Sequence, residues 1–193
     1  MLPNLKDYKI LLGSKSPRRR ELLQLLRIPF TVVNVHNAEE TFPSTMPPME
    51  VPQYLSGIKA DAYLSLLQHN ELIITADTLV ILGDRILGKP SSTTEACEML
   101  RALSDHTHQV VTGVTIATHR NRTSFTSVTD VKFGHLSDDE IRYYVDSFSP
   151  LDKAGAYGIQ EWIGGVAVEE IRGSFYNVMG LPIHRLFREL KNF

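Results

Sequence analysis

Apolar runs of strand length alternate with helical segments along most of this chain. Runs typical of strands occupy Tyr8–Leu12, Phe30–Val35, Leu72–Ala76, Val110–Thr118, Ser124–Phe133 and Val166–Ile171. Apolar spacings of three and four residues predict helices over Pro17–Leu26, Val51–Leu67, Thr93–Leu103, Ser137–Phe148 and Pro182–Leu190. This alternation indicates an α/β fold. The fourth and fifth runs flank the polar stretch HRNRT and predict an antiparallel hairpin, so we expect a mixed sheet.

The composition of the chain limits the functional classes to which it can belong. With 20 basic and 22 acidic residues the chain has no global basic field, so we expect no nonspecific nucleic-acid binding and only local anion sites. No apolar run reaches the ~20 residues of a membrane span and the N-terminus lacks the apolar centre of a signal peptide, so we expect a cytoplasmic protein. The single cysteine, Cys97, lies in a helical pattern and is interpreted as a packed thiol.

The stretch LLGSKSPRRRELL (residues 11–23) predicts a strand, a short turn and a helix start. Ser16 is a favourable N-cap and Pro17 suits the first helical turn. Three arginines follow at Arg18–Arg20, where the partial positive charge of a helix N-terminus disfavours cations. Either these arginines form a solvated face, or a bound polyanion compensates their charge.

Three further positions could carry chemistry. Asp77 ends the apolar run LIITAD, so it is either an acid at the end of a buried strand that faces a ligand or a capping residue of a turn. Lys89 lies between a turn glycine and a proline, as a phosphate ligand or as a surface lysine. The glycine-rich stretch DKAGAYGIQ (residues 152–160) either approaches a ligand closely, with the amide of Gln160 reading a base edge, or is a turn without a ligand.

Several common catalytic signatures are missing from the sequence. It contains no GxxxxGK[ST] loop, no GxGxxG after the first strand, no HExxH pair and no GxSxG elbow. A P-loop enzyme, a dinucleotide fold, a zincin and an α/β-hydrolase are therefore not supported. His106 and His108 are better explained as residues at the entry of a strand than as metal ligands.

Taken together, these stretches resemble the Maf family of nucleoside triphosphate pyrophosphatases, in the family's order and along almost the whole chain. The matching segments are SKSPRR at 14–19 followed by ELL, Glu39-Glu40, GIKA at 57–60, ADT at 76–78, GKP at 88–90, TGV at 112–114, DKAGAYGIQ, and VMGLP at 178–182. The DKAGAYGIQ version is similar to the subgroup that acts on dTTP and UTP. Glu161 and Trp162 depart from the family, where glycine is frequent after the glutamine.

The resemblance implies a fold and a set of roles. The fold would be α/β and two-lobed, with an elongated mixed sheet flanked by helices and a cleft between the lobes, formed by residues 1–193 as a single domain. It implies a homodimer and a divalent cation, Mg²⁺ or Mn²⁺. The implied site comprises Asp77 as catalytic proton acceptor, Arg18, Thr78 and Gln160 for substrate specificity, Ser14, Arg19, Lys59, Lys89 and Lys153 for phosphate, and Glu40 with Asp77 for metal.

Two other functions are compatible with the same residues. One is a broader pyrophosphatase that removes noncanonical or modified nucleotides. The other is a nucleotide-binding regulator, for example of cell division, for which hydrolysis is incidental. Failure to release pyrophosphate from any triphosphate would favour the regulator.

Overall fold

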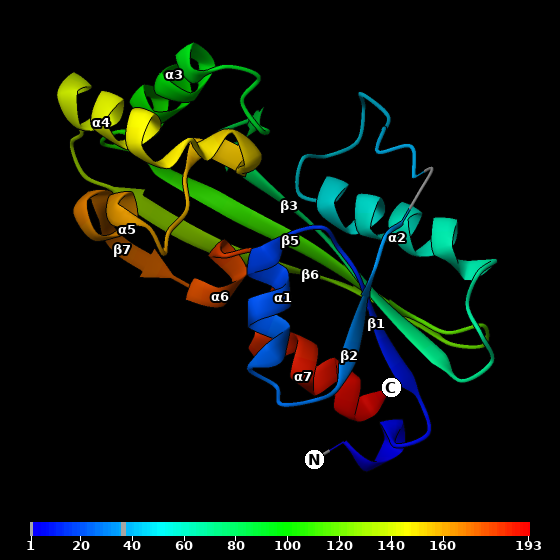
Figure 1. Ribbon diagram of the computed structural model, residues 1–193. Helices are drawn as coiled ribbons and strands as arrows, with labels where there is room; N and C mark the ends of the chain where they lie inside the picture. The colour runs from blue at the N-terminus through cyan, green and yellow to red at the C-terminus, as the bar shows by residue number, and fades with distance from the viewer. Residues whose placement is uncertain (1, 36–37) are drawn as a thin grey trace. The chain divides into compact units, whose positions relative to one another are not determined.

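A seven-stranded mixed sheet is the framework of the chain in the computed structural model, which describes residues 2–35 and 38–193 (Figure 1). Its strands are β1 (Lys9–Gly13), β2 (Phe30–Val33), β3 (Glu71–Leu82), β4 (Arg85–Leu87), β5 (Thr107–Ala117), β6 (Arg122–Phe133) and β7 (Val168–Arg172). The strand order is β2-β1-β3-β5-β6-β7, and β4 pairs with β3. β1 is parallel to β2 and β3, whereas β4 and β7 are antiparallel to their partners. The expected mixed sheet is confirmed.

Helices connect the strands, as the alternation predicts. They are α1 (Pro17–Gln24), α2 (Val51–Leu64), α3 (Thr93–Leu103), α4 (Asp138–Phe148), α5 (Trp162–Ala167), α6 (Phe175–Val178) and α7 (Ile183–Asn192), with short 3₁₀ turns at Pro3–Leu5, Pro150–Asp152 and Ala154–Ala156. Serine caps explain where several of them begin. Ser137, for example, accepts a hydrogen bond from the backbone N–H of Glu140, whose carboxylate reaches back to the N–H of Ser137. No helix of the described residues is long and apolar enough to cross a membrane.

Two expected elements differ from the structure. The run Val166–Ile171 was expected to be a strand throughout, but its first residues end α5, and β7 begins only at Val168. Ile163 and Ala167 lie four residues apart and are both buried, which is the spacing of a helix and not of a strand. The strand expected to end at Ala76 continues to Leu82, because the second apolar run, TLVIL, extends β3 and pairs with β4.

The chain divides into two compact units. The first comprises Met1–Asp77, Thr112–Ser127 and Gly180–Phe193, and the second Thr78–Val111 and Val128–Met179. In the first unit a buried cluster joins β1, α2, β3 and β5 through Leu11, Ala60, Ile73 and Ala117, with Leu67. In the second unit a larger cluster joins β3 to β6 with α3, α4 and α5, and Cys97 packs against it as expected. Each unit therefore has an apolar core of its own.

Helix α2 lies unusually close to the strands beneath it. A Cβ atom built on Gly113 of β5 would lie 2.1 Å from the backbone nitrogen of Gln53, so only glycine fits there. Beside this contact Ser56 of α2 forms a hydrogen bond with Thr115 (2.8 Å), and the hydroxyl of Thr75 donates to the Ser56 carbonyl (2.6 Å). Small residues and paired hydroxyls thus fix α2 on the sheet, and the glycine of the TGV segment has a packing role.

Candidate active site

The turn after β1 builds the N-terminus of α1 as the sequence predicts. Ser14 Oγ accepts a hydrogen bond from the backbone N–H of Ser16 (3.2 Å), and Ser16 Oγ caps the helix by accepting from the N–H of Arg19 (3.5 Å). Pro17 is the first helical residue. The strand, turn and capped helix are therefore confirmed, and they place the three arginines in the first turn of α1.

The three arginines of this turn differ in their environment. Arg20 is exposed, as expected for a solvated residue, whereas Arg18 and Arg19 are half-buried. Arg19 donates from Nε to the Gly180 carbonyl (2.8 Å) and from Nη1 to the Ala76 carbonyl (2.9 Å). Arg19 thereby connects three of the quoted sequence motifs, SPRR, ADT and VMGLP.

Burial lowers the pKa of the Arg19 guanidinium below its ordinary value, and the nearby carboxylate of Asp77 opposes this shift. Arg18 adds a repulsive contribution and Glu40 an attractive one. The guanidinium keeps its charge, because arginine does not deprotonate in proteins. Arg18 and Arg19 therefore share one electrostatic cluster with the two carboxylates. Sequence reasoning assigned Arg19 to phosphate alone and did not foresee that the main chain holds it.

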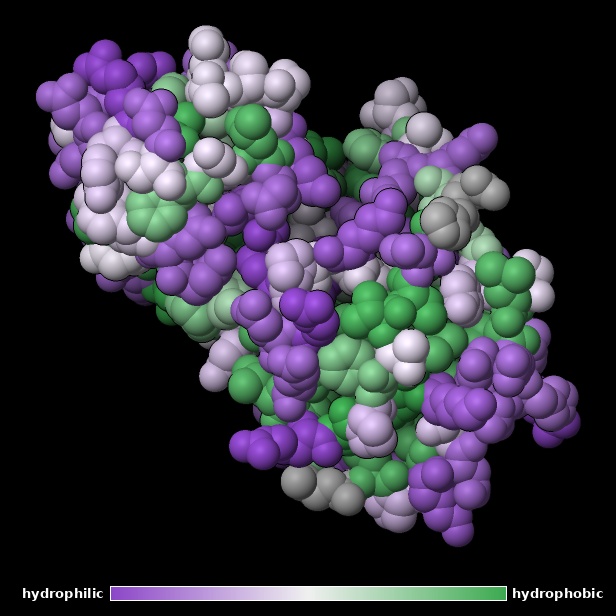
Figure 2. Space-filling model, in the orientation of Figure 1, coloured by the Kyte–Doolittle hydropathy of each residue, from purple (hydrophilic) through white to green (hydrophobic). Residues whose placement is uncertain are grey.

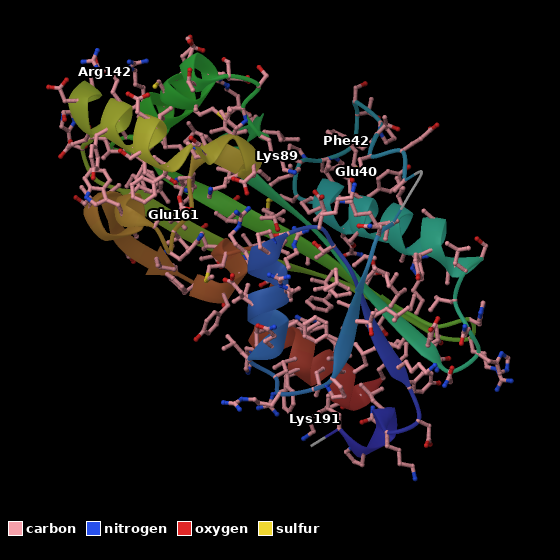
Figure 3. All side chains as sticks on the ribbon, viewed as in Figure 1. Glu40, Phe42, Lys89, Arg142, Glu161 and Lys191 are labelled. Atoms are coloured by element: carbon pink, nitrogen blue, oxygen red, sulfur yellow. The ribbon has the colours of Figure 1, made fainter. Side chains whose placement is uncertain are left out.

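The carboxylates of this cluster share one lysine. Lys59 Nζ lies 2.5 Å from Oδ1 of Asp77 and 3.0 Å from Oε2 of Glu40. The side chains of Lys59 and Asp77 are only 12% and 13% exposed, whereas that of Glu40 is 56% exposed. Figure 3 labels Glu40 in the segment that leads from β2 into α2. A little-exposed carboxylate needs a compensating partner, and Lys59 supplies it from α2.

Asp77 lies within β3, so the expectation that it ends a strand is wrong. The parallel register pairs Gly13, the last residue of β1, with Thr75, two residues before Asp77. The turn that begins at Ser14 therefore follows the end of β1 beside the part of β3 that carries Asp77. A capping role for Asp77 is excluded by its position in the strand.

A divalent cation is compatible with the donors of this cluster. Mg²⁺ is typically bound through one or two carboxylates together with water and substrate phosphates. Glu40 and Asp77 are two carboxylates that already contact one cationic group, the Lys59 ammonium. Residues 2–35 and 38–193 contain no group of three or more His, Cys, Asp or Glu side chains that could hold a metal ion. The cluster therefore fits a metal that substrate oxygens help to bind.

The second unit contains the other expected site residues. Thr78 directly follows Asp77 in β3 and is half-buried, and Lys89 is exposed in the turn after β4, as labelled in Figure 3. Gln160 is exposed at the end of the glycine-rich loop, although residues 155–159 before it are buried. The exposed amide of Gln160 is thus presented by a loop that is itself packed into the unit.

Lys153 has an environment that the sequence did not reveal. Its ammonium lies 2.8 Å from Oδ1 of Asp152 and 3.2 Å from Oε1 of Glu161, and its side chain is only 8% exposed. Two carboxylates therefore already compensate its charge. Lys153 holds the two ends of the glycine-rich loop together.

A buried His108–Tyr157 pair also escaped the sequence analysis. Nε2 of His108 lies 2.7 Å from the Tyr157 hydroxyl, and both rings pack edge-on against Phe133. Burial lowers the pKa of His108 to about 4, so the imidazole is neutral at pH 7. His108 is the second residue of β5, as expected for a residue at the entry of a strand. The pair anchors the glycine-rich loop to β5, and no local pattern in the sequence indicates it.

Comparisons with known proteins agree with the geometry. The family described as Maf-like protein matches residues 9–193. A dTTP/UTP pyrophosphatase of Bacteroides thetaiotaomicron is 52% identical over 99% of each chain, and one of Porphyromonas gingivalis is 53% identical over this whole chain and 98% of its own. A solved HAM1 protein from Coxiella burnetii has a TM-score of 0.53 at 16% identity, covering 96% of this chain and 100% of that chain, which bears on the fold alone.

Proposed function

Because the chain belongs to the Maf-like protein family, we propose that it hydrolyses the α–β phosphoanhydride bond of nucleoside triphosphates, with dTTP and UTP preferred. The products are the nucleoside monophosphate and pyrophosphate. Relatives named dTTP/UTP pyrophosphatase that are about half identical over the full length support this substrate choice. The observation that carries the reaction type is the cluster of Lys59, Asp77 and Glu40 within electrostatic range of Arg19.

Catalysis at a phosphoanhydride is largely positioning and neutralisation of charge. Arg18 and Arg19 are proposed to bind phosphate oxygens, with Ser14 and the backbone N–H groups of the α1 N-terminus beside them. The two main-chain contacts of Arg19 orient its guanidinium before any phosphate arrives. Arg19 would thus be a fixed partner for the polyanion that compensates the charge of these arginines.

Asp77 is proposed to accept the proton of the attacking water. Its carboxylate is held by Lys59, so its orientation is fixed before the reaction begins. Glu40 and Asp77 would hold a divalent cation, Mg²⁺ or Mn²⁺, which when bound would neutralise phosphate charge and favour ionisation of water. Lys59 keeps the remaining carboxylate charge compensated.

Recognition of the base is proposed to involve Gln160, with Thr78 and Arg18 as further specificity residues. Lys89, which is exposed, remains a proposed phosphate contact. Lys153 fits that role less well, because Asp152 and Glu161 already share its ammonium. We therefore assign Lys153 to the frame of the glycine-rich loop.

We further propose that residues 1–193 work as one functional domain, in the cytoplasm where nucleoside triphosphates are found, without nucleic acid as a partner. We also propose a homodimer. β2 is an edge strand of the sheet, and Val32 on it is 43% exposed, with Leu25 nearby in sequence 56% exposed. Figure 2 shows an apolar area over β1 and β2 on this face. Light scattering after size exclusion tests the dimer, and a Val32→Lys variant should dissociate it if this edge is the interface.

One screen tests the proposed activity. The purified chain is incubated with each canonical triphosphate and with base-modified triphosphates, in Mg²⁺ or Mn²⁺, and released pyrophosphate is measured. We expect the highest kcat/KM for dTTP and UTP, and monophosphate as the second product. Release of orthophosphate with a diphosphate would contradict the bond assignment, and no release from any triphosphate would overturn the enzymatic function.

A further inference from the structure

The glycine-rich loop is anchored to its unit at three points before it reaches Gln160. The N–H of Gly155 donates to the Gly88 carbonyl (3.0 Å), the Tyr157 hydroxyl bonds His108, and the N–H of Gly158 donates to the Tyr144 hydroxyl (3.0 Å). A Cβ on Gly155, whose φ is +66°, would lie 2.9 Å from the side chain of Val80. The backbone up to Gly158 is therefore fixed by contacts with four different segments.

Glu161 closes this loop with its side chain. One carboxylate oxygen lies 3.2 Å from Lys153 Nζ, and the other accepts a short hydrogen bond from the Tyr144 hydroxyl. Tyr144 is fully buried, and burial together with the bond to Glu161 raises the pKa of its hydroxyl, so it remains a donor. With both oxygens engaged, the Glu161 carboxylate has one position and one orientation.

Gln160 and Glu161 fold back over the same glycine. A Cβ atom built on Gly158 would lie 2.9 Å from Nε2 of Gln160 and 2.9 Å from Cδ of Glu161. The Gln160 amide and the fixed carboxylate thus both lie against Gly158. A carboxylate attracts the NH₂ end of an amide and repels its oxygen, so Glu161 favours one of the two orientations of the Gln160 amide.

The orientation of that amide matters for pyrimidines. Uracil and thymine present an N–H donor beside a carbonyl acceptor, whereas cytosine presents a ring-nitrogen acceptor beside an amino donor. A glutamine amide complements either pattern, but only after a flip that exchanges its oxygen and nitrogen. We infer that Glu161 is the positioning residue that holds the Gln160 amide in the orientation for uracil and thymine, and so excludes cytosine. This inference rests on the proposed function and extends it to the choice among pyrimidines.

The test compares kcat/KM for UTP and CTP in the unsubstituted chain and three variants. Glu161→Gln removes the charge with little change in shape. Gly158→Ala keeps the charge, but its new methyl would lie 2.9 Å from Nε2 of Gln160 and from Cδ of Glu161 and so displaces both side chains. Glu169→Gln is the matched control, because Glu169 pairs with Lys132 in the same unit and both are about half exposed. Thermal unfolding of each variant is measured alongside.

We expect the UTP:CTP ratio to fall by roughly tenfold or more in Glu161→Gln and Gly158→Ala, because an amide held by a charged partner is released. Glu169→Gln should keep the ratio of the unsubstituted chain. An equal loss for both substrates would reduce Glu161 to a structural residue, and an unchanged ratio in either folded variant would also overturn the inference. Equal use of UTP and CTP by the unsubstituted chain would overturn the inference but leave the proposed function standing. Absence of pyrophosphate release would sink the proposed function and the inference together.

Discussion

Lys59 Nζ lies 2.5 Å from Oδ1 of Asp77 and 3.0 Å from Oε2 of Glu40, so that one ammonium forms ion pairs with both carboxylates. Two carboxylates that both lie this close to one ammonium would repel each other if the ammonium were absent. A divalent cation that binds there must share the carboxylates with the ammonium or displace it. Binding of a cation there would therefore be coupled to the position of Lys59.

Replacing Asp77 with asparagine should leave the fold and nucleotide binding intact and reduce turnover by roughly 10²–10⁴-fold, the usual contribution of general-base catalysis. Asp61→Asn is a suitable control, because Asp61 lies on the same helix as Lys59 but pairs with Arg122 of β6, outside the cluster. Pyrophosphate release and nucleotide titration measure the two effects. Turnover like that of the unsubstituted chain would remove Asp77 as the proton acceptor.

Lys59→Met should tighten binding of Mn²⁺ in the absence of nucleotide, by roughly tenfold, because the competing ammonium is removed. Turnover should nevertheless fall, since the orientation of Asp77 is lost with its partner. Calorimetric titration of Mn²⁺ measures the first effect. Weaker binding than in the unsubstituted chain would show that Glu40 and Asp77 are not the metal ligands.

Gln160→Ala should erode the preference for pyrimidine triphosphates, because the amide is exposed for contact while the loop before it is buried. The ratio of kcat/KM for dTTP to that for dGTP should fall by roughly tenfold, with little change in inhibition by pyrophosphate. If the ratio is unchanged, Gln160 does not read the base.

Gly113→Ala should lower the free energy of unfolding by about 3 kcal/mol, at the upper end for overpacking, because its methyl would meet the backbone of α2. Activity should fall as well, since α2 carries Lys59. Gly165→Ala is the control: a methyl there meets no atom within 4 Å, so stability should hold or rise slightly. Denaturant unfolding gives the free energy of unfolding of both variants. Equal values for the two would contradict the close packing of α2 at Gly113.

Acid should destabilise the protein through His108. Its pKa is about 4 in the folded chain and 6.5 ordinarily, so between these values the unfolded chain binds the proton and the folded chain does not. The contribution of neutral His108 is complete above pH 6.5 and is lost as pH falls toward 4, up to about 3 kcal/mol. His108→Gln, which can still bond Tyr157, should flatten the unfolding free energy over this window. A slope equal to that of the unsubstituted chain would show that His108 titrates normally.

Periodicity and capping predicted most of the fold. The helix over Thr93–Leu103 has the expected bounds, and the others end within a few residues of them. The failures have physical causes. The short helix α5 was not predicted, because the glycines of WIGGVA have low helix propensity. The helix forms through burial of Ile163 and Ala167. β4 is too short to give a periodic signal.

The resemblance supplied the candidate residues of the site, but not the contacts that hold them. Residue type could not show that Arg19 is tied to the Ala76 and Gly180 carbonyls, since both acceptors are main-chain atoms. Nor could residue type show that Glu161 compensates the charge of Lys153, because the fold of the loop brings these two side chains together. Contacts between positions far apart in the sequence leave no local pattern.

The close packing of α2 on the sheet has a consequence for how the sequence of such an enzyme changes in evolution. A helix held only by large apolar side chains can shift its position when one of them changes size, because the neighbouring side chains repack. In addition to its apolar contacts, α2 approaches Gly113 closely and is tied to the sheet by hydrogen bonds among Ser56, Thr75 and Thr115, which together allow it one position. Variation in substrate range should therefore fall on exposed positions such as Gln160, while the helix that carries Lys59 stays where it is.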